Sequence, residues 1–419
     1  MGPDPARLLD LTRLVSRLGR GALTGVDRVE LAYLRQFLAD ETRVLGLART
    51  ALGLVLLDRS GCAGVLDRAE GRVALGPGDL LSRLSGRRGA RAQAEADLRR
   101  LALARAPGPL APALLRRHVP GGAVYFNVGH SNLSRRGLRR LRAGGVGRIV
   151  VLVHDTIPLD HPEYCRADRI APFRRKLAAV AAEADLVIHT TETGRAATER
   201  HLAALGRVPP GVVAGLGVAP VAADPAALPP SLLAALDPER PMFLCLGTIE
   251  PRKDHAFLLD LWQALAKGPM PVPQLVVAGG RGWADRAVLD RLDRLAAAGH
   301  DVLECPGLSD GAIAALMDRA EALVFPTRAE GYGLPAVEAA VRGCPIFCSP
   351  LPVFREILGD YPVYLESGDA YSWLETIKDR SQRGNRRGTG TATGAGAPGG
   401  RLARPDWQDH FNRVLSRVD

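Results

Sequence analysis

The chain has 419 residues, of which 47% are hydrophobic and 24% are charged. A chain of this length is expected to form about two domains, each with its own core, and its charged fraction excludes global disorder. Lysines and arginines number 55 against 45 aspartates and glutamates, which gives a net charge of +10. This excess favours an anionic partner, such as a nucleotide, a nucleic acid or a membrane surface, without choosing among them.

The cysteines and the chain ends bear on the cell compartment. Six cysteines are scattered along the chain without a C-x-x-C pair, which argues against a disulfide framework and suits a reducing cytosol. The N-terminal sequence has no signal pattern, and no uninterrupted apolar run approaches about 18 residues. We therefore expect a cytoplasmic protein without a membrane span.

Short apolar runs alternate with helical patterns along the chain. The runs are continuous rather than alternating, which indicates strands covered on both faces and hence parallel sheets. The expected strands are 147–154, 185–189, 242–246, 274–278 and 322–325, and the expected helices are 166–183, 192–204, 254–266, 284–298, 310–320 and 333–342. This alternation predicts a doubly wound α/β protein.

A proline-rich, weakly patterned segment near 205–240 predicts a link between two α/β halves. We expect an N-terminal domain over 1–225 and a C-terminal domain over 226–380. A low-complexity composition predicts a flexible linker over 381–404. The arginine-rich segment 84–117 predicts a basic helix and loop of unassigned role.

The last residues, 405–419, predict a terminal helix. Its apolar face needs a surface to cover and contains Trp407, Phe411, Val414 and Leu415. Reaching back to the first domain is one solution. Our prediction places this helix outside the sheet of the second domain.

The strongest chemical signal is the segment 330–338, Glu-Gly-Tyr-Gly-Leu-Pro-Ala-Val-Glu, which follows the expected strand 322–325. Gly331 and Gly333 allow a ligand to approach the backbone closely. The next helix is expected to start near Leu334, and its free N–H groups predict a site for an anion or for sugar hydroxyls. This loop follows the carboxyl end of the strand, and ligands of open α/β sheets bind at the carboxyl ends of the strands.

A second signal is the segment 247–255, Gly-Thr-Ile-Glu-Pro-Arg-Lys-Asp-His, which follows the expected strand 242–246. Two adjacent cations, Arg252 and Lys253, can neutralise a diphosphate, one as a planar fork and the other as a movable point charge. Taken alone, the same pair is more typical of a surface basic pair beside Glu250 and Asp254.

Four segments in this order resemble the retaining glycosyltransferases of family four, and in particular their bacterial mannosyltransferase-like members. They are 247–255, 275–283, 306–317 and 330–338, and the resemblance covers about 239–360. In the first half, 9–33, 125–130 and 154–162 are also similar to this family. The resemblance implies a GT-B fold, in which two Rossmann-like domains with parallel sheets face each other across a cleft.

The resemblance also implies roles for the matching positions. Arg252 and Lys253 would bind the donor diphosphate, Glu330 would lie near the transferred sugar, and Glu338 would hold ribose hydroxyls. The implied catalytic residues are Glu330, Lys253, Arg252 and His154, and the implied donor-binding residues are Glu338, Gly331, Tyr332, Gly333, Leu334, Gly247 and Gly25.

Two of these positions lie in the first half. Gly25 would face the diphosphate from the other domain, and His154, which closes an expected strand, would lie beside the sugar. The alternative for His154 is a structural histidine that is hydrogen-bonded next to Asp155. His130 and His189 also end strands, and a structural role is the main expectation for both.

Charge explains the predicted chemistry. Cleavage of a nucleotide-sugar bond builds positive charge on the sugar and negative charge on the diphosphate, where the two cations would lie. A cationic clamp can replace a metal ion, so we predict metal-independent transfer without a cofactor. The resemblance implies that the anomeric configuration is retained.

The sequence thus predicts an enzyme that moves a hexose, with mannose as the first choice, from a nucleotide-sugar to a glycan or lipid-linked acceptor. Contact with the inner membrane surface is compatible with this activity, and no nucleic-acid partner is expected. Two alternatives stay open: a basic protein that binds membranes or nucleic acid, and a transferase fold without activity. The missing aromatic-interleaved basic stripe counts against nucleic-acid binding.

Overall fold

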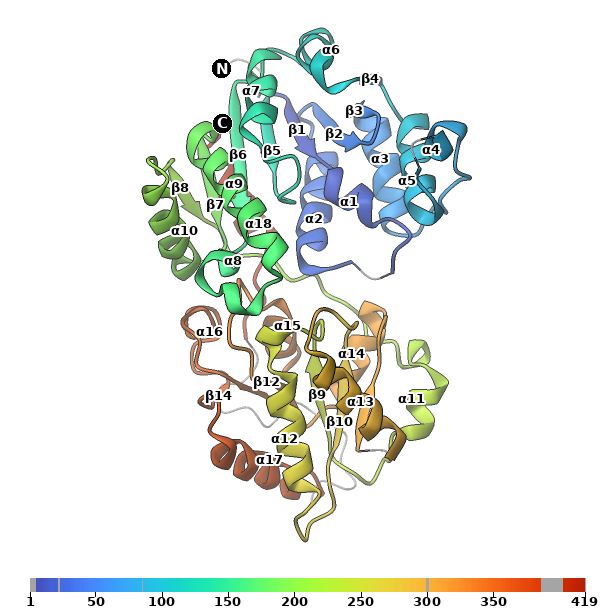
Figure 1. Cartoon of the computed structure of the whole chain (residues 1–419), viewed down its shortest axis with the longest axis vertical. Helices are drawn as coiled ribbons and strands as arrows, with labels where there is room; N and C mark the ends of the chain where they lie inside the picture. The colour runs from blue at the N-terminus through green and yellow to red at the C-terminus, as the bar shows by residue number, and fades with distance from the viewer. Residues whose placement is uncertain (1–4, 22, 85, 299–300, 386–401, 419) are drawn as a thin grey trace. The chain divides into compact units, whose positions relative to one another are not determined.

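The computed structural model describes residues 5–21, 23–84, 86–298, 301–385 and 402–418. The chain forms two compact units (Figure 1). Unit 1 comprises Met1–Thr156, Ile170–Leu216 and Trp407–Asp419, and unit 2 comprises Ile157–Arg169 and Gly217–Asp406. The change of unit after Leu216 falls within the proline-rich segment 205–240.

Unit 1 is built on an eight-stranded sheet with the order β4-β3-β2-β1-β5-β6-β7-β8. Its strands are β1 (Arg7–Asp10), β2 (Val44–Thr50), β3 (Gly53–Leu57), β4 (Ala104–Ala106), β5 (Val124–Asn127), β6 (Arg148–Val153), β7 (Leu186–His189) and β8 (Gly211–Val213). Along the sheet, the neighbouring strands β2, β1, β5, β6, β7 and β8 pair in parallel. The strand β3, which lies between β2 and the edge strand β4, is antiparallel to both, which departs from the predicted parallel sheet. A tight turn joins β2 to β3 and leaves no room for a crossover helix.

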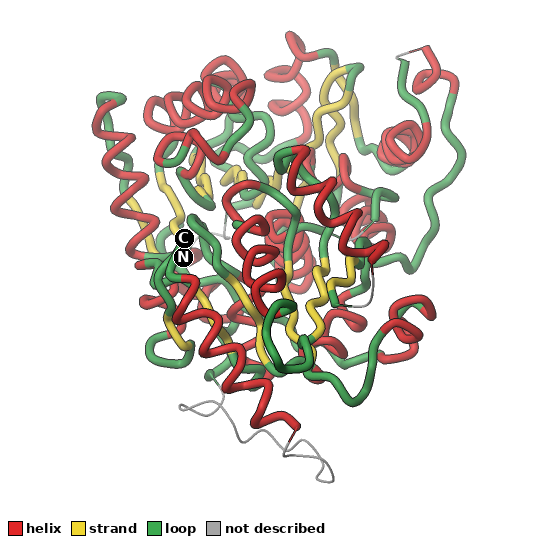
Figure 2. The backbone as a smooth tube through the Cα atoms, turned by 60° about the horizontal axis from the view of Figure 1, so that its bottom comes forward, coloured by secondary structure: helices red, strands yellow, loops and turns green. Residues whose placement is uncertain are grey.

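Helices lie alongside this sheet (Figures 1 and 2). Those wholly or mostly in unit 1 are α1 (Thr12–Arg17), α2 (Gly25–Ala39), α3 (Arg59–Ala69), α4 (Leu80–Leu84), α5 (Gly89–Arg100), η1 (Gly108–Leu110), α6 (Ala111–His118), α7 (Arg135–Ala143), α9 (Ala167–Glu183), α10 (Glu192–Ala204) and α18 (Trp407–Leu415). The strands β1, β5 and β7 are buried along their whole length, as expected for a sheet covered on both faces.

The C-terminal helix α18 packs in unit 1, so the prediction that it covers the second domain's sheet is wrong. Its Phe411 ring packs edge-on against Tyr33 of α2, with 4.9 Å between the ring centroids. The Tyr33 hydroxyl lies 2.7 Å from Nε2 of His410, and Nδ1 of His410 lies 3.0 Å from the Gly215 carbonyl oxygen. Aromatic side chains of α2 supply the apolar surface that this helix needs.

Unit 2 contains a six-stranded, fully parallel sheet with the order β11-β10-β9-β12-β13-β14. Its strands are β9 (Met242–Leu246), β10 (Gln274–Ala278), β11 (Val302–Glu304), β12 (Ala322–Phe325), β13 (Ile346–Cys348) and β14 (Val363–Tyr364). Its helices are α8 (Ile157–Asp160), η2 (Pro162–Tyr164), η3 (Pro225–Ala227), α11 (Pro230–Ala235), η4 (Pro251–Lys253), α12 (His255–Leu265), α13 (Arg286–Ala298), α14 (Asp310–Arg319), α15 (Leu334–Arg342), α16 (Pro352–Leu358) and α17 (Ala370–Asn385).

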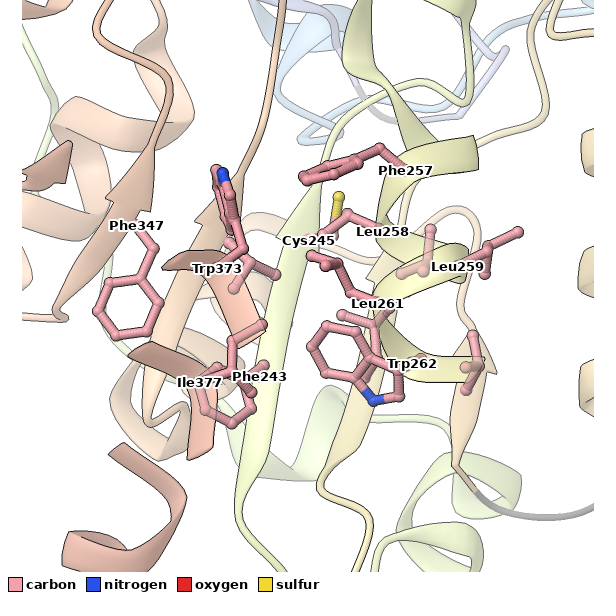
Figure 3. Packing of buried hydrophobic residues seen from close by; sticks show 14 of the residues in the cluster. Phe243, Cys245, Phe257, Leu258, Leu259, Leu261, Trp262, Phe347, Trp373 and Ile377 are labelled. Atoms are coloured by element: carbon pink, nitrogen blue, oxygen red, sulfur yellow. The ribbon is translucent and has the colours of Figure 1, made fainter. Parts of the chain in front are cut away.

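The core of unit 2 forms between β9 and the helices α12 and α17 (Figure 3). Trp262 of α12 and Trp373 of α17 are almost fully buried, and Phe257 packs edge-on against Trp373. The helix α17 continues to Asn385, so the predicted linker 381–404 begins with helical residues. Residues 386–401 of that prediction lie outside the described residues. Within the described part of the chain, no helix has the length and apolar character needed to cross a membrane.

Candidate functional site

The predicted chemical segments of unit 2 meet where the strand order reverses. The central strand β9 pairs with β10 on one side and with β12 on the other. The loop after β9 carries Arg252 and Lys253, and the loop after β12 carries Glu330. A reversal of strand order leaves a crevice at the carboxyl ends of the strands, which is where open α/β sheets bind ligands.

A cluster of two cations and one carboxylate occupies this point. The ammonium group of Lys253 donates a hydrogen bond to Oε1 of Glu330. Nη1 of Arg252 lies 2.8 Å from the same oxygen, and the Thr327 hydroxyl lies 3.2 Å from it. The Lys253 ammonium also lies 4.0 Å from the centroid of the Phe325 ring, a cation–π contact. Glu330 therefore fixes both cations at the end of β12.

Burial makes this cluster electrostatically strong. The side chains of Lys253 and Glu330 are 6% and 7% exposed, whereas that of Arg252 is 22% exposed. Burial would raise the pKa of Glu330, but Arg252 and Lys253 together hold it below its usual value. Burial lowers the pKa of Lys253, and the Glu330 carboxylate opposes that shift. The carboxylate is thus ionised at neutral pH and its charge is shared by two cations.

Neighbouring residues brace the loop that holds the two cations. Nε of Arg252 forms an ion pair with Glu250, and its Nη1 lies 2.9 Å from the Ala329 carbonyl oxygen. Asp254 adopts a left-handed backbone, with φ at 54°, just before α12. Arg328 supports this turn, because its Nε donates to Asp254 Oδ2 at 2.7 Å and its backbone N–H donates to the Arg252 carbonyl at 2.7 Å.

Arg328 and Thr327 were not among the predicted site residues. Both lie in the loop between β12 and Glu330, and each contacts the loop after β9. Only the pairing of β9 with β12 brings these contacts about, so the local sequence carries no signal for them.

Two predicted site glycines fill positions that require glycine. Gly333 has φ at 81°, and a Cβ atom there would lie 2.4 Å from Cε1 of Phe354. Gly247 has φ at 133°, and a Cβ atom there would lie 3.2 Å from Cε of Lys253. The first glycine lets α15 begin directly after the Glu330 loop, and the second lets the lysine stem pass close to the backbone.

The remaining predicted residues of this motif surround the start of α15. Leu334 is its first residue, and Pro335 follows in the first turn, where a missing N–H costs nothing. Tyr332 is buried, while Gly331 and Leu334 are partly buried. Glu338 is partly buried on the same helix, about 6 Å along the axis from Leu334 at 1.5 Å per residue. Glu330 and Glu338 thus occupy the loop and the helix, as predicted.

His154 and Gly25 belong to unit 1. Nε2 of His154 lies 2.6 Å from the Val128 carbonyl oxygen, and Nε2 of His130 lies 2.9 Å from that of Leu152. A carbonyl oxygen only accepts, so Nε2 of His154 carries the proton and its Nδ1 is left as the acceptor. Burial lowers the pKa of His154 to about 4, so its ring is neutral at pH 7.

The start of α2 places Gly25 as the first residue of that helix. Thr24 and Asp27 form a capping box around it, because the Asp27 carboxylate accepts from the Thr24 backbone N–H at 2.8 Å. Nε of Arg13 donates to Asp27 at 2.7 Å. Gly25 itself is exposed.

Unit 1 contains a polar network that the sequence did not predict. It lies where β1 has β2 on one side and β5 on the other, which is the same topological position as the cluster of unit 2. Asp10 accepts from the Tyr125 hydroxyl at 2.8 Å and from Nδ2 of Asn132 at 2.7 Å. Burial raises the pKa of Asp10 and, more strongly, that of Glu30.

A family model matches the part of unit 2 that contains the cation cluster. Residues 234–386 match the family model described as glycosyl transferases group 1. Both loops of the cluster lie within this match. The resemblance found from the sequence motifs is therefore confirmed.

Two curated relatives are mannosyltransferases of Escherichia coli. The chain is 31% identical over 247 residues to the serotype-specific mannosyltransferase WbdA, across 55% of this chain and 29% of that protein. It is 30% identical over 144 residues to the O-antigen chain mannosyltransferase B, across 33% of this chain and 38% of that protein. The chain thus matches well under half of the length of either relative.

A solved structure resembles most of the chain. Anabaena Alr3699/HepE, solved in complex with UDP and glucose, aligns with a TM-score of 0.56 at 16% identity. The alignment covers 90% of this chain and 91% of that chain. This likeness shows the GT-B fold and confirms the predicted class of two Rossmann-like domains.

Proposed function

We propose that this chain, whose residues 234–386 match the group 1 glycosyl transferases, transfers a hexose from a nucleotide-sugar to an acceptor. The observation that carries this proposal is the buried cluster of Arg252, Lys253 and Glu330 at the point where the unit 2 strand order reverses. Two fixed cations at such a point suit the diphosphate of a nucleotide-sugar.

The cluster supports catalysis as well as binding. As the sugar–phosphate bond breaks, negative charge grows on the departing diphosphate, and cations that are already in place stabilise it without reorganising. In this proposal Arg252, the more exposed cation, meets the diphosphate first. Lys253 stabilises the leaving group, and Glu330 orients both cations beside the transferred sugar.

Other parts of the donor are assigned to nearby residues. We propose that Glu338 binds the ribose hydroxyls and that the backbone of Gly331, Tyr332 and Gly333 meets the sugar. Gly247 keeps the first loop close enough to the sheet for Lys253 to reach its position. From unit 1, Gly25 would offer backbone N–H groups to the diphosphate, and neutral His154 would offer its Nδ1 to a sugar hydroxyl.

The sugar and the stereochemistry are further parts of the proposal. The two mannosyltransferase relatives favour mannose as the transferred hexose. Retention of the anomeric configuration follows the resemblance to retaining enzymes. Because Arg252 and Lys253 provide the charge that a divalent ion would otherwise give, we propose transfer that does not depend on a metal ion.

The acceptor is proposed to be a glycan or a lipid-linked saccharide at the inner membrane surface. The relative named for O-antigen chains supports a growing saccharide as acceptor. A chain with net charge +10 is also suited to working beside anionic lipids.

A ligand screen followed by a turnover assay tests this function. Thermal unfolding is measured with GDP-mannose, UDP-glucose and the free nucleotides. A nucleotide-sugar at about 100 times its Kd should stabilise the protein by about 2.7 kcal/mol. The stabilising donor is then incubated with candidate saccharide acceptors, and the product is analysed by NMR, which also reports its anomeric configuration. Absence of stabilisation by every nucleotide-sugar would exclude the proposal.

A further inference from the structure

The arginines on and next to α4 and α5 form two groups in the structure. The first group holds helices together. Nη2 of Arg99 lies 2.6 Å from Asp79, and Nε of Arg91 lies 2.8 Å from Glu95 one turn along α5. The Arg99 side chain is 5% exposed. Arg99 thus attaches α5 to the turn that begins α4, whereas the pair of Arg91 and Glu95 lies within α5, and both arginine charges are neutralised internally.

The second group is exposed on α4 and just after it. Arg83, Arg87 and Arg88 are all exposed. Of these three arginines, only Arg87 forms an ion pair with an acidic side chain in the described part of the chain, and its Nε lies 3.6 Å from Glu95. The sequence from Leu80 to Ala94 contains four arginines and neither aspartate nor glutamate. This part of the surface therefore keeps an uncompensated positive charge.

The helix α4 also exposes its leucines and buries its serine. Leu80, Leu81 and Leu84 are 68%, 40% and 75% exposed. Ser82, on the opposite side, is fully buried, and its hydroxyl donates to the Ala92 carbonyl at 3.0 Å. Polar bonds thus anchor α4 to α5, and the leucines face outward. The three leucines therefore contribute little to the core, and their exposure is not explained by packing within the unit.

We propose that this surface, defined as Leu80, Leu81, Arg83, Leu84, Arg87 and Arg88, docks on an anionic phospholipid bilayer. The leucines enter the acyl boundary, and the arginines pair with lipid phosphates. Charge complementarity selects this occupant, because exposed leucines beside exposed arginines match an apolar layer covered by negative charge. In Figure 1, α4 and α5 lie at one side of unit 1. The inference rests on the proposed function, since a lipid-linked acceptor is presented at such a surface.

Vesicle sedimentation tests the surface directly with the full chain. Wild-type protein should bind phosphatidylcholine vesicles that contain phosphatidylglycerol and should not bind vesicles of phosphatidylcholine alone. At about 1 kcal/mol per arginine, the change R83A/R88A should weaken binding by roughly 30-fold. The change L80S/L84S should weaken it by about tenfold or more, because two largely exposed leucines no longer enter the bilayer.

Matched controls separate the surface from general charge and hydrophobicity. Arg136 of α7 is exposed, and Leu233 of α11 is 44% exposed, so R136A and L233S remove one charge and one leucine elsewhere. Both should bind like wild type. Binding of both double variants as strong as that of wild type would overturn the proposal. Wild-type protein that does not bind anionic vesicles would also overturn it, and this result is expected if the surface binds another protein.

Separate measurements test the membrane-docking proposal and the proposed enzymatic function. Donor affinity in solution, measured on the same double variants, should be unchanged, because none of the four exchanged residues is among the residues proposed to bind the donor. Loss of vesicle binding with intact donor affinity identifies the surface. A wild-type protein that binds vesicles but no nucleotide-sugar would refute the enzymatic proposal alone.

Discussion

Replacement of Lys253 by methionine separates its charge from its bulk. Methionine keeps an unbranched side chain in the buried space between Gly247 and Phe325 but removes the ammonium group. Loss of one charge-assisted hydrogen bond costs about 1.5–3 kcal/mol, or roughly 10–150-fold. The diphosphate gains negative charge as the bond breaks, so we expect most of this loss in kcat and less in donor Kd.

The assay combines calorimetric donor affinity with steady-state turnover. K267M, at an exposed lysine of the same unit, serves as the matched control and should behave like wild type. An unchanged kcat in K253M would refute the assignment. A fall in donor affinity as large as the fall in kcat/KM would instead show that Lys253 acts only on the bound ground state.

The same variant has a pH signature in its stability. The folded-state pKa of Glu330 lies below its ordinary value, so the ionised carboxylate stabilises the fold above about pH 4.5, and this stabilisation is lost as the pH falls. Without Lys253, burial is opposed by Arg252 alone and the pKa rises. K253M should therefore lose stability relative to wild type as the pH rises from 4 to 7. A gap in unfolding free energy that is independent of pH would contradict this reasoning.

Further predictions concern donor binding, backbone geometry, metal and acid stability. E338A should weaken donor binding by about 10-fold or more in calorimetry with little change in kcat, because ribose hydroxyls change little during transfer; normal binding with lost turnover would overturn the ribose role. G333A should lower the unfolding free energy by about 2–4 kcal/mol, since the added Cβ would be strained and would meet Phe354, whereas G280A adds a Cβ in open space and should change little. Turnover should survive a chelator, and strict dependence on added magnesium or manganese would refute the cationic clamp. Burial lowers the pKa of His410 from 6.5 to about 4, so wild type should lose about 3 kcal/mol relative to H410Q as the pH falls through this range, measured by denaturant unfolding; parallel curves would count against a buried neutral ring.

The sequence predicted the elements of unit 2 closely because their signals are local. Continuous apolar runs at 242–246, 274–278 and 322–325 correspond to β9, β10 and β12 with the same bounds. The helix after Gly333 begins at Leu334 as expected, since the glycine and the following proline mark a helix start. Arg252, Lys253 and Glu330 were predicted as parts of one site, and the structure brings them together.

Features that depend on distant pairing escaped prediction. The contact of Arg328 with Asp254 exists only because β9 and β12 are neighbours. The destination of α18 depends on the aromatic side chains of α2, which lie almost the whole chain length away. Asp10 and Glu30 give no local signal either, because an acidic residue in a sequence does not show whether it will be buried.

The most direct test of the central claim is calorimetric titration of the stabilising nucleotide-sugar into wild type and the double variant R252A/K253A. The account predicts binding by wild type and a loss of roughly 10-fold or more in the double variant, mainly because the charged contact of Arg252 with the diphosphate disappears. K267M should bind like wild type. If the double variant bound the nucleotide-sugar with wild-type affinity, the diphosphate would not lie at this cluster.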